Sequence, residues 1–243
     1  MNEASSGPRL LAVMPAFNEG ASIASVIEEL RLHQPRFDIA VVDDGSKDDT
    51  AMLATAAGAR VLPLPFNLGI GGAVQTGFIY AAEEGYDVVI QVDSDGQHDP
   101  QQMDAILGPV LDGTADVVIG SRFLGGGTFA HAAHRRFLIG VFARLVTIAT
   151  GRRFTDTSSS FRAYNRRAIR ICAADYPQGF LESVESTVTL CHYGLELIEV
   201  PVTIRQRESG STTLSLGRTM VYTIKVVIAI VMGALRKTPS GSH

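Results

Sequence analysis

The sequence predicts an α/β fold with a mostly parallel central sheet and helices on both of its faces. Three observations predict it: short apolar runs alternate with helical stretches over the first 122 residues, the links between them are short, and the runs are apolar throughout. Strands of that kind are typical of a parallel sheet that is covered on both faces. With 243 residues, 46% of them hydrophobic, the chain is long enough to bury such a core.

The elements are expected in alternation from the N-terminus. Apolar runs of strand length lie at 10–17 (LLAVMPAF), 38–46 (DIAVVDDGS), 59–65 (ARVLPLP), 87–92 (DVVIQV) and 115–122 (ADVVIGSR). Helices are expected at 22–33, which is amphipathic, at 48–57 after an Asp-Asp-Thr start, at 73–84 after the glycine-rich turn 67–72, and at 100–111.

The pattern loosens after Arg122. Residues 124–134 are rich in glycine and alanine and are expected to form a loop, whereas 137–151 is expected to be a helix that is apolar on nearly every face. Such a helix is buried or contacts lipid. A helix and then a strand are expected within 179–204. The apolar run 226–235 has ten residues, too few to span a bilayer, so we expect it to lie in the membrane interface or to pack on the core or a partner subunit.

Charge divides the chain into unlike parts. Residues 1–120 hold 5 Lys or Arg against 18 Asp or Glu, whereas 121–170 hold ten arginines against one acid, Asp156. An acidic part suits metal binding, and an arginine-rich part suits phosphates, which arginine binds in a planar, often bidentate way. A solvated basic face is the alternative for the arginines. Nucleic acid is not expected as a partner, because the net charge is −4 and no recognition motif stands out.

The cysteines and the N-terminus indicate a cytosolic protein. Cys172 and Cys191 form no CxxC motif and no cluster with histidine, so neither a zinc site nor a disulfide framework is expected. The N-terminal MNEASSGPR is short and polar, and no signal peptide is predicted.

Residues 88–98 (VVIQVDSDGQH) carry the strongest chemical signal. In an extended backbone, residues i and i+2 point to the same side, so Asp93 and Asp95 face one point beyond the strand, where open α/β sheets bind ligands. Two carboxylates with the Gln97 amide oxygen nearby suit Mg²⁺ or Mn²⁺. The alternative is a solvated turn, since Asp and Gly are ordinary turn residues.

Polar or glycine-rich segments follow each of the first four predicted strands. They are PAFNE (15–19), DDGS (43–46), NLGIGG (67–72) and DSD (93–95). Because the carboxyl ends of parallel strands meet at one edge of a sheet, the four segments predict a nucleotide pocket with a metal at its floor. The chain lacks GxGxxG and GxxxxGK[ST], so neither a dinucleotide-binding fold nor a P-loop is expected.

These segments also carry a resemblance to a known family. PAFNE, VVDDGS, NLGIGGAVQTG, QVDSDGQH, IGSRF and EVPVTIRQRESGS, in that order, resemble the family 2 glycosyltransferases of the GT-A fold, and most of all the dolichyl- or polyprenyl-phosphate mannosyltransferases. The resemblance covers about residues 9–212. It implies a GT-A domain over 1–212, with 213–243 forming an amphipathic or apolar C-terminal helix and tail.

The resemblance implies a role for each residue that matches a family motif. For the nucleotide sugar it implies Pro15, Phe17, Glu19, Val42, Asp44, Asp93, Ser94, Asp95, Arg207 and Ser211; for the metal, Asp93, Asp95 and Gln97; and for the acceptor phosphate, Arg122, Arg135 and Arg136. Asp95, Arg122 and Arg207 are the residues it places in catalysis. Glu185 matches a family glutamate and is expected to be structural.

The implied function is transfer of a sugar from a nucleotide diphosphate to polyprenyl or dolichyl phosphate, with inversion and with Mg²⁺ or Mn²⁺. Mannose from GDP-mannose is the favoured donor, and a UDP-sugar such as UDP-glucose comes second. An ionised lipid phosphate needs little help from a base, whereas a sugar hydroxyl acceptor, in polysaccharide or glycolipid synthesis, would need a carboxylate base. Asp156 is the obvious candidate for that base. A non-catalytic subunit that binds nucleotide sugar is a third hypothesis, and the intact acid and arginine set argues against it.

Three positions depart from the family pattern. Ile70 stands where a polar residue is frequent, Thr212 where lysine is frequent, and Ser160 where glycine is common. No long pair of membrane-spanning segments follows the domain, so the expected location is peripheral, on the cytoplasmic face of the membrane, with a membrane subunit or a second copy as partner. His98, His131 and His134 are expected to be surface or loop residues.

Overall fold

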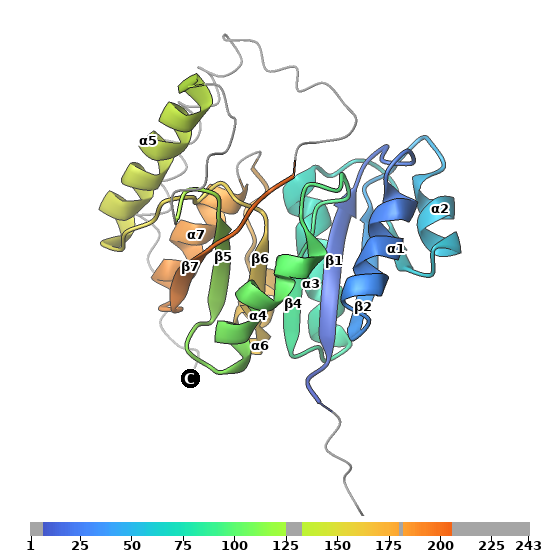
Figure 1. Cartoon of the computed structure of the whole chain (residues 1–243), viewed down its shortest axis with the longest axis horizontal. Coiled ribbons are helices and arrows are strands. Elements are labelled where there is room, and N and C mark those ends of the chain that lie inside the picture. The colour runs from blue at the N-terminus through green and yellow to red at the C-terminus, as the bar shows by residue number, and fades with distance from the viewer. Residues whose placement is uncertain (1–6, 125–132, 180–181, 206–243) are drawn as a thin grey trace, which may run out of the picture.

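A seven-stranded sheet organises the computed structural model of the chain, which describes residues 7–124, 133–179 and 182–205 (Figure 1). The strand order is β3-β2-β1-β4-β6-β5-β7. The pairs β1–β2, β2–β3, β1–β4 and β5–β7 are parallel, whereas β6 is antiparallel to both of its neighbours. The strands are β1 (Leu10–Ala16), β2 (Phe37–Asp43), β3 (Arg60–Pro63), β4 (Val88–Gln91), β5 (Val117–Ser121), β6 (Arg162–Asn165) and β7 (Leu197–Pro201).

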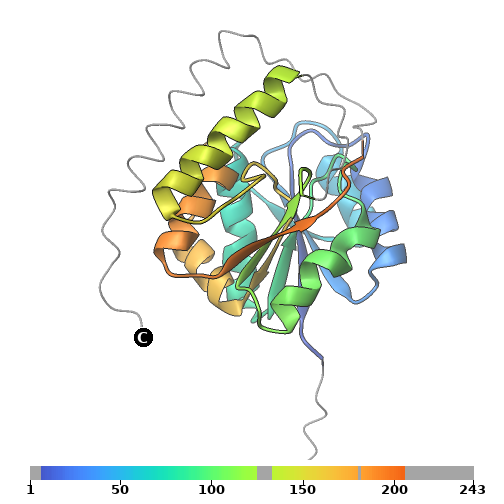
Figure 2. The ribbon, with the colours of Figure 1, turned by 60° about the vertical axis from the view of Figure 1, so that its left-hand side comes forward.

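Helices cover both faces of this sheet because the strands are apolar on both sides. Along β1, Leu10, Ala12 and Met14 pack with one helical layer, whereas Leu11 and Val13 pack with the other, as the two-residue period of a strand requires. The first layer holds α1 (Ile23–His33), α2 (Thr50–Ala56) and α4 (Met103–Leu111), the last preceded by η1 (Pro100–Gln102). The second holds α3 (Ile70–Glu83), α5 (Ala133–Thr150), α6 (Arg166–Ala174) and α7 (Glu182–His192), with α5 lying across α7 (Figure 2).

The predicted fold is confirmed, and so are the elements expected over residues 10–122. The helix expected at 137–151 corresponds to α5, and the helix and strand expected within 179–204 are α7 and β7. Two elements were not predicted, β6 and α6. Their sequence, RAYNRRAIRICAA, holds four arginines and lacks the apolar run that marked the other strands.

The expectations for the C-terminal part lie outside the described residues. This applies to the apolar run 226–235 and to the boundary after residue 212, which stay predictions. Among the described residues, no helix is both long and apolar enough to cross a membrane.

One edge of the sheet collects the polar segments that follow the strands. β1, β2 and β4 are parallel, so the segments after Ala16, Asp43 and Gln91 emerge together. β6 runs the opposite way, so the segment that precedes it, residues 156–161, reaches the same edge. The glycine-rich turn before α3 also lies there. Glycine is needed at Gly71 in the first turn of α3, because a Cβ at that position would lie 2.4 Å from the Pro177 carbonyl oxygen.

Candidate active site

A pocket of about 540 Å³ opens at this edge of the sheet. Three groups of residues surround it. The nucleotide-side wall is formed by Pro15, Ala16, Phe17, Glu19, Asp44, Asn67, Gly69, Ile70 and Ala73; the floor by Asp93, Ser94 and Asp95; and the serine wall by Ser158, Ser160, Glu182 and Ser183. The pocket therefore joins six segments of the chain that lie far apart in the sequence.

The nucleotide-side wall combines an exposed ring with a fixed loop. Phe17 is 44% exposed beside the pocket, and the Glu19 amide donates to the Thr50 hydroxyl at 2.9 Å. An exposed ring next to polar groups suits the flat apolar face of a nucleobase. Pro15, Phe17 and Glu19, three of the residues expected to bind the nucleotide, are thus brought together.

Asp44 holds the glycine-rich turn against the pocket. Its Oδ1 accepts from the Leu68 amide at 2.6 Å and its Oδ2 from the Gly69 amide at 3.0 Å. The carboxylate is 4% exposed, and both of its oxygens already accept from backbone donors. Asp44 lines the pocket as expected, and the structure adds that it positions the turn. Val42 is placed differently: its side chain is fully buried in the core against α3 and does not line the pocket, which corrects the expectation of a contact with nucleotide.

The floor brings two carboxylates to one place. Asp93 and Asp95 both line the pocket, with Ser94 between them donating from its hydroxyl to the Pro15 carbonyl at 3.0 Å. Asp93 Oδ2 accepts a hydrogen bond from the Ser160 hydroxyl at 2.8 Å, and Asp95 Oδ1 accepts one from the Gln97 backbone amide at 3.0 Å. The Gln97 side chain is not part of the lining, so two of the three residues expected to bind a metal lie on the pocket floor, and the metal assignment stays a prediction.

The donor set fits a hard divalent cation that also binds substrate. Within the described residues no group of three or more His, Cys, Asp or Glu side chains is arranged to hold a metal. Mg²⁺ and Mn²⁺ in phosphate-transfer sites are commonly held by one or two carboxylates, and the remaining ligands come from substrate phosphates and water. Asp93 and Asp95 match that pattern.

His98 lies in the connection between β4 and η1 and is buried, which corrects the expectation of a surface position. It is 3% exposed and stacks on Phe161 with ring centroids 4.5 Å apart. Its Nδ1 accepts from the Asp93 amide at 3.0 Å, so the ring proton lies on Nε2, which faces Asp93 Oδ2 at 3.5 Å. Burial lowers the pKa of His98 against the pull of Asp93 and Asp95, so the neutral ring supports the floor from below.

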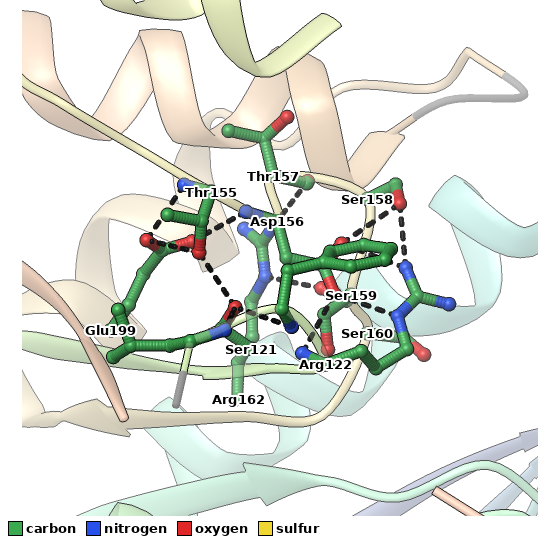
Figure 3. Close-up of polar contacts among 12 residues, drawn as sticks. Ser121, Arg122, Thr155, Asp156, Thr157, Ser158, Ser159, Ser160, Arg162 and Glu199 are labelled. Carbon is green, nitrogen blue, oxygen red and sulfur yellow. Dashed lines mark hydrogen bonds and ion pairs between the residues drawn. The ribbon is translucent and has the colours of Figure 1, made fainter. Parts of the chain in front are cut away.

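Arg122 forms a bidentate pair with Asp156 behind the serine wall (Figure 3). Its Nε lies 2.6 Å from Asp156 Oδ2 and its Nη2 lies 2.7 Å from Oδ1, and the same Nη2 donates to the Ser158 hydroxyl at 2.7 Å. Glu199 fixes the segment from below by accepting from the Asp156 amide at 2.6 Å. Arg122 itself is absent from the lining and reaches the pocket through Ser158.

Arg162 holds the serine wall together from inside the protein. Its guanidinium is fully buried and donates to the carbonyls of Ser159, Thr157 and Ser183 at 2.7, 2.7 and 2.8 Å (Figure 3 shows the first two). These carbonyls belong to the segment before β6 and to the start of α7. One buried cation thus joins the two parts of the wall, at distances typical of charge-assisted hydrogen bonds.

Glu182 is a pocket residue that the sequence did not reveal. Its side chain lines the pocket, the residue is 5% exposed, and Oε1 accepts from the Ser183 hydroxyl at 2.5 Å. Burial raises the pKa of this carboxyl, while the Ser183 hydroxyl and the Arg162 charge act in the opposite direction. In the sequence Glu182 stands next to a phenylalanine-leucine pair and outside any recognised motif, so no signal marked it.

The family model for glycosyl transferase family 2 matches residues 11–171, about two thirds of the chain. The chain belongs to glycosyl transferase family 2. It is a glycosyltransferase, as the sequence predicts, and its sheet has the GT-A fold. The hypothesis of a non-catalytic subunit is not retained.

Relatives of this glycosyltransferase include enzymes with lipid acceptors in their names. An undecaprenyl-phosphate mannosyltransferase of Micrococcus luteus is 35% identical over 86% of this chain and 88% of that protein. A polyprenol monophosphomannose synthase of Mycolicibacterium smegmatis is 30% identical over 85% and 81%. The solved structure of glucosyl-3-phosphoglycerate synthase from Mycobacterium tuberculosis with Mn²⁺, UDP-glucose and phosphoglyceric acid has a TM-score of 0.73 at 22% identity, covering 96% of this chain and 82% of that one, and shows the shared fold.

Several residues expected in the site of this glycosyltransferase lie outside what the structure describes. Arg207 and Ser211 belong to the undescribed C-terminal residues, and the side chains of Arg135 and Arg136 in α5 are also outside the described part of the structure. Their roles stay predictions. The segment that leads to Arg207 is described as far as Arg205, whose amide donates to the Gln97 carbonyl at 2.9 Å and whose guanidinium pairs with Glu29 at 2.8 Å.

Proposed function

We propose that the chain transfers a sugar, with mannose favoured, from a nucleotide diphosphate to a polyprenyl or dolichyl phosphate, with inversion at the anomeric carbon and with a divalent metal. One observation carries the proposal. Asp93 and Asp95 share the floor of a pocket that has the Phe17 wall on one side and the arginine-linked Ser158 on the other. That order matches a nucleoside, a charged diphosphate and the transferred sugar in sequence, with Arg122 behind Ser158 on the side proposed for the acceptor.

The donor proposal draws on the relatives. Both enzymes named above for mannose or phosphomannose support GDP-mannose as the favoured donor. A UDP-sugar such as UDP-glucose comes second, because the M. tuberculosis structure of the same fold holds UDP-glucose.

Asp93 and Asp95 would hold Mg²⁺ or Mn²⁺, and Mn²⁺ in the M. tuberculosis structure supports this assignment. The bound metal supplies a Lewis acid that stabilises negative charge on the departing nucleoside diphosphate. The protein contributes the placement of the two carboxylates. Ser160 donates to Asp93 Oδ2, and the Gln97 amide donates to Asp95 Oδ1.

For the acceptor we propose a lipid phosphate, bound by Arg122 together with Arg135, Arg136 and, on the diphosphate, Arg207. An oxygen of that phosphate forms the new bond to the anomeric carbon while the bond from this carbon to the diphosphate breaks. The nucleoside diphosphate leaves with the bonding electrons. The acceptor is already ionised at neutral pH, so no proton has to be removed from it. Arginine donors stabilise the charge on both phosphate groups.

The lipid acceptor places the proposed enzyme at a membrane surface, on its cytoplasmic face. Residues 137–151 and the run 226–235 are the segments we propose for contact with lipid, with a membrane subunit or with a second copy of the chain.

A second candidate is transfer to a sugar hydroxyl, and one specific observation favours it. Such an acceptor needs a carboxylate base, and Asp156 is excluded from that role because it is fully buried and paired with Arg122. Glu182 is a carboxyl that lines the pocket, and it would have to serve instead.

Transfer of labelled sugar to a short polyprenyl phosphate in detergent tests the proposal. GDP-mannose, UDP-glucose and UDP-N-acetylglucosamine would be compared with Mn²⁺ or Mg²⁺, and then with chelator. We expect metal-dependent, chloroform-extractable product from one donor, and loss of that product in Asp95→Ala but not in Asp104→Asn, a surface change in the first turn of α4. Full activity of Asp95→Ala would end the metal assignment. Product only with a hydroxyl acceptor would move the function to the second candidate.

The arginines proposed for the acceptor are tested separately. Changing Arg135 and Arg136 together to Ala should raise the KM for polyprenyl phosphate much more than the KM for the nucleotide sugar, because the acceptor loses cations and the donor does not. An equal rise in both values would contradict the assignment.

A further inference from the structure

The order of strands fixes where each part of a donor would lie, if the proposed function is correct. The nucleotide-side wall follows β1, β2 and β3, and the floor follows β4. The serine wall precedes β6 and begins α7, beyond β4 in the sheet. A nucleotide sugar is a linear arrangement of nucleoside, diphosphate and sugar. With the nucleoside at the first wall and the diphosphate above the floor, the sugar falls against the serine wall.

The hydroxyl hydrogens of the serine wall are already used within the protein. Ser158 donates to Asp156 Oδ1 at 3.1 Å, Ser160 donates to Asp93 Oδ2 at 2.8 Å, and Ser183 donates to Glu182 Oε1 at 2.5 Å. A hydroxyl has one hydrogen and two lone pairs, so each of these oxygens can still accept but cannot donate elsewhere. The wall is therefore a surface of hydrogen-bond acceptors.

Such a surface distinguishes between ligands. An anionic phosphate needs donors, and acceptors beside a carboxyl group would disfavour it. A sugar presents several hydroxyl hydrogens, each of which needs an acceptor when it leaves water. The chemistry of the serine wall therefore matches a polyhydroxylated ligand.

Glu182 stands out on this wall because its carboxyl group is buried without a cation. Within the described residues no ion pair involves it, and the nearby Arg162 directs its donors to carbonyl groups and to the Ser186 hydroxyl. Burying a carboxyl group without full hydrogen bonding is unfavourable. A carboxyl group that is retained under these conditions in a cleft is a candidate for ligand binding.

The layer behind Glu182 is also polar. The Tyr176 hydroxyl is buried with no hydrogen-bond partner among the described residues, and the buried Tyr164 hydroxyl lies by the Arg162 guanidinium. Both rings lie near enough to Glu182 for its charge to influence them. Apolar side chains behind this wall would have left no buried polar group to satisfy. Buried polar groups without partners indicate room for water or for a ligand group.

We propose that Glu182 accepts a hydrogen bond from a hydroxyl group of the transferred sugar, and that it determines which sugar the enzyme accepts. The inference rests on the proposed function and adds the residue that recognises the transferred sugar. Ser160 and Ser183 lie beside Glu182 on the same wall and offer further acceptors. A site built to bind a hydroxyl discriminates strongly against analogues that lack it, because its own polar groups are then left unpaired.

Calorimetric titrations with Mn²⁺ test the inference without depending on turnover. The wild type, Glu182→Gln and Glu182→Ala would be titrated with GDP, GDP-mannose, UDP and UDP-glucose. We expect the preferred nucleotide sugar to bind Glu182→Ala more weakly, on the order of 10- to 100-fold, because one hydrogen bond to a charged group is lost. The affinity of Glu182→Gln for the nucleotide sugar should lie between those of the wild type and Glu182→Ala. The affinity for the nucleotide diphosphate alone should not change in either variant.

Two controls sharpen this result. Glu185→Gln alters a carboxyl group on the same helix that is absent from the pocket lining, and it should bind all four ligands as the wild type does. Donor analogues that lack one sugar hydroxyl should identify the partner. Removing that hydroxyl should weaken binding to the wild type and have no further effect in Glu182→Ala.

Each contrary outcome is distinct. An equal loss of affinity for the nucleotide diphosphate and the nucleotide sugar would overturn the inference, because Glu182 would then act on the nucleotide or on the fold. The inference would also be overturned if Glu182→Ala bound the nucleotide sugar as the wild type does but lost the acidic limb of the pH profile of kcat. Glu182 would then act as a base for the acceptor. A wild type that binds none of the four ligands would overturn the proposed function itself.

Discussion

Arg122 and Asp156 form a bidentate ion pair in which the Asp156 side chain is fully buried and that of Arg122 is 10% exposed (Figure 3). The pair has two consequences. Asp156 is not available as a general base, and the guanidinium of Arg122 is fixed in one orientation beside the pocket. An arginine held in this way loses little further freedom when it binds a phosphate.

Asp156→Asn should weaken binding of the lipid acceptor more than binding of the nucleotide sugar. The amide is similar in size but removes the charge, so Arg122 would be left half-paired in a buried place, with a loss of about 3 kcal/mol in the free energy of unfolding. Denaturant titration measures the loss, and the KM for polyprenyl phosphate against that for nucleotide sugar measures the effect on binding. Arg152, paired with Glu196 on the surface, supplies the control. Glu196→Gln should change neither KM, and a purely donor-side effect of Asp156→Asn would contradict the proposed role of Arg122.

Much of this fold could be predicted because its signals are local. Each apolar run identifies a strand by itself, and parallel strands bring the segments that follow them to one edge. The adjacent acids Asp93 and Asp95 could therefore be placed on a pocket floor without knowledge of any distant contact. β6 escaped prediction because its burial depends on its neighbours: Arg162 pairs in register with Gln91 on β4, and its guanidinium is satisfied by carbonyls both close in sequence, such as Thr157, and distant, such as Ser183.

The parts of the site that were missed depend on contacts across the chain. Ser160 meets Asp93 over 67 residues, and Arg122 meets Asp156 over 34. Neither separation leaves a pattern in the sequence. Glu182 entered the pocket because α7 begins beside the segment before β6, and His98 is buried because Phe161 covers its ring. Val42 lay near the predicted site in sequence, yet the alternation of β2 turned it toward α3.

Ser160→Ala should weaken metal binding. The change removes the hydroxyl that donates to Asp93 Oδ2, and loss of such a partner typically lowers metal affinity on the order of tenfold or more. Mn²⁺ binding in the presence of nucleotide diphosphate, followed by electron paramagnetic resonance of the free ion, measures the effect. Ser159→Ala is the matched control, since the Ser159 hydroxyl has no hydrogen-bond partner among the described residues. Equal Mn²⁺ affinity in the two variants would show that the Ser160 hydroxyl does not influence Asp93.

Asp44→Asn should weaken nucleotide binding through the glycine-rich turn. One carboxylate oxygen becomes an amide NH₂ group, which then faces the Leu68 or the Gly69 amide donor, at a cost of roughly 1–3 kcal/mol. The affinity for nucleotide diphosphate should fall while the Mn²⁺ affinity of the free protein stays unchanged. Asp43→Asn alters the neighbouring carboxylate, which is absent from the lining, and should leave nucleotide affinity as it is. The role assigned to Asp44 fails if both variants bind nucleotide as the wild type does.

Glu182→Gln should gain stability relative to the wild type as the pH rises. Burial raises the pKa of Glu182 in the folded protein above its ordinary value of 4.5, with Asp93 acting in the same direction and Arg162 and Ser183 against it. The protonated carboxyl therefore stabilises the fold below pH 4.5, and this contribution is lost as the pH rises through the folded pKa. Glutamine is neutral at every pH, so Glu182→Gln keeps this contribution to stability as the pH rises. Denaturant titrations from acidic to neutral pH in chelator, without nucleotide, should show a stability difference that grows in favour of Glu182→Gln above pH 4.5, whereas Asp104→Asn on the surface should show no such growth. A stability difference that does not change with pH would mean that the Glu182 carboxyl ionises as freely in the folded protein as in the unfolded chain. Burial of Glu182 would then be no argument for sugar binding.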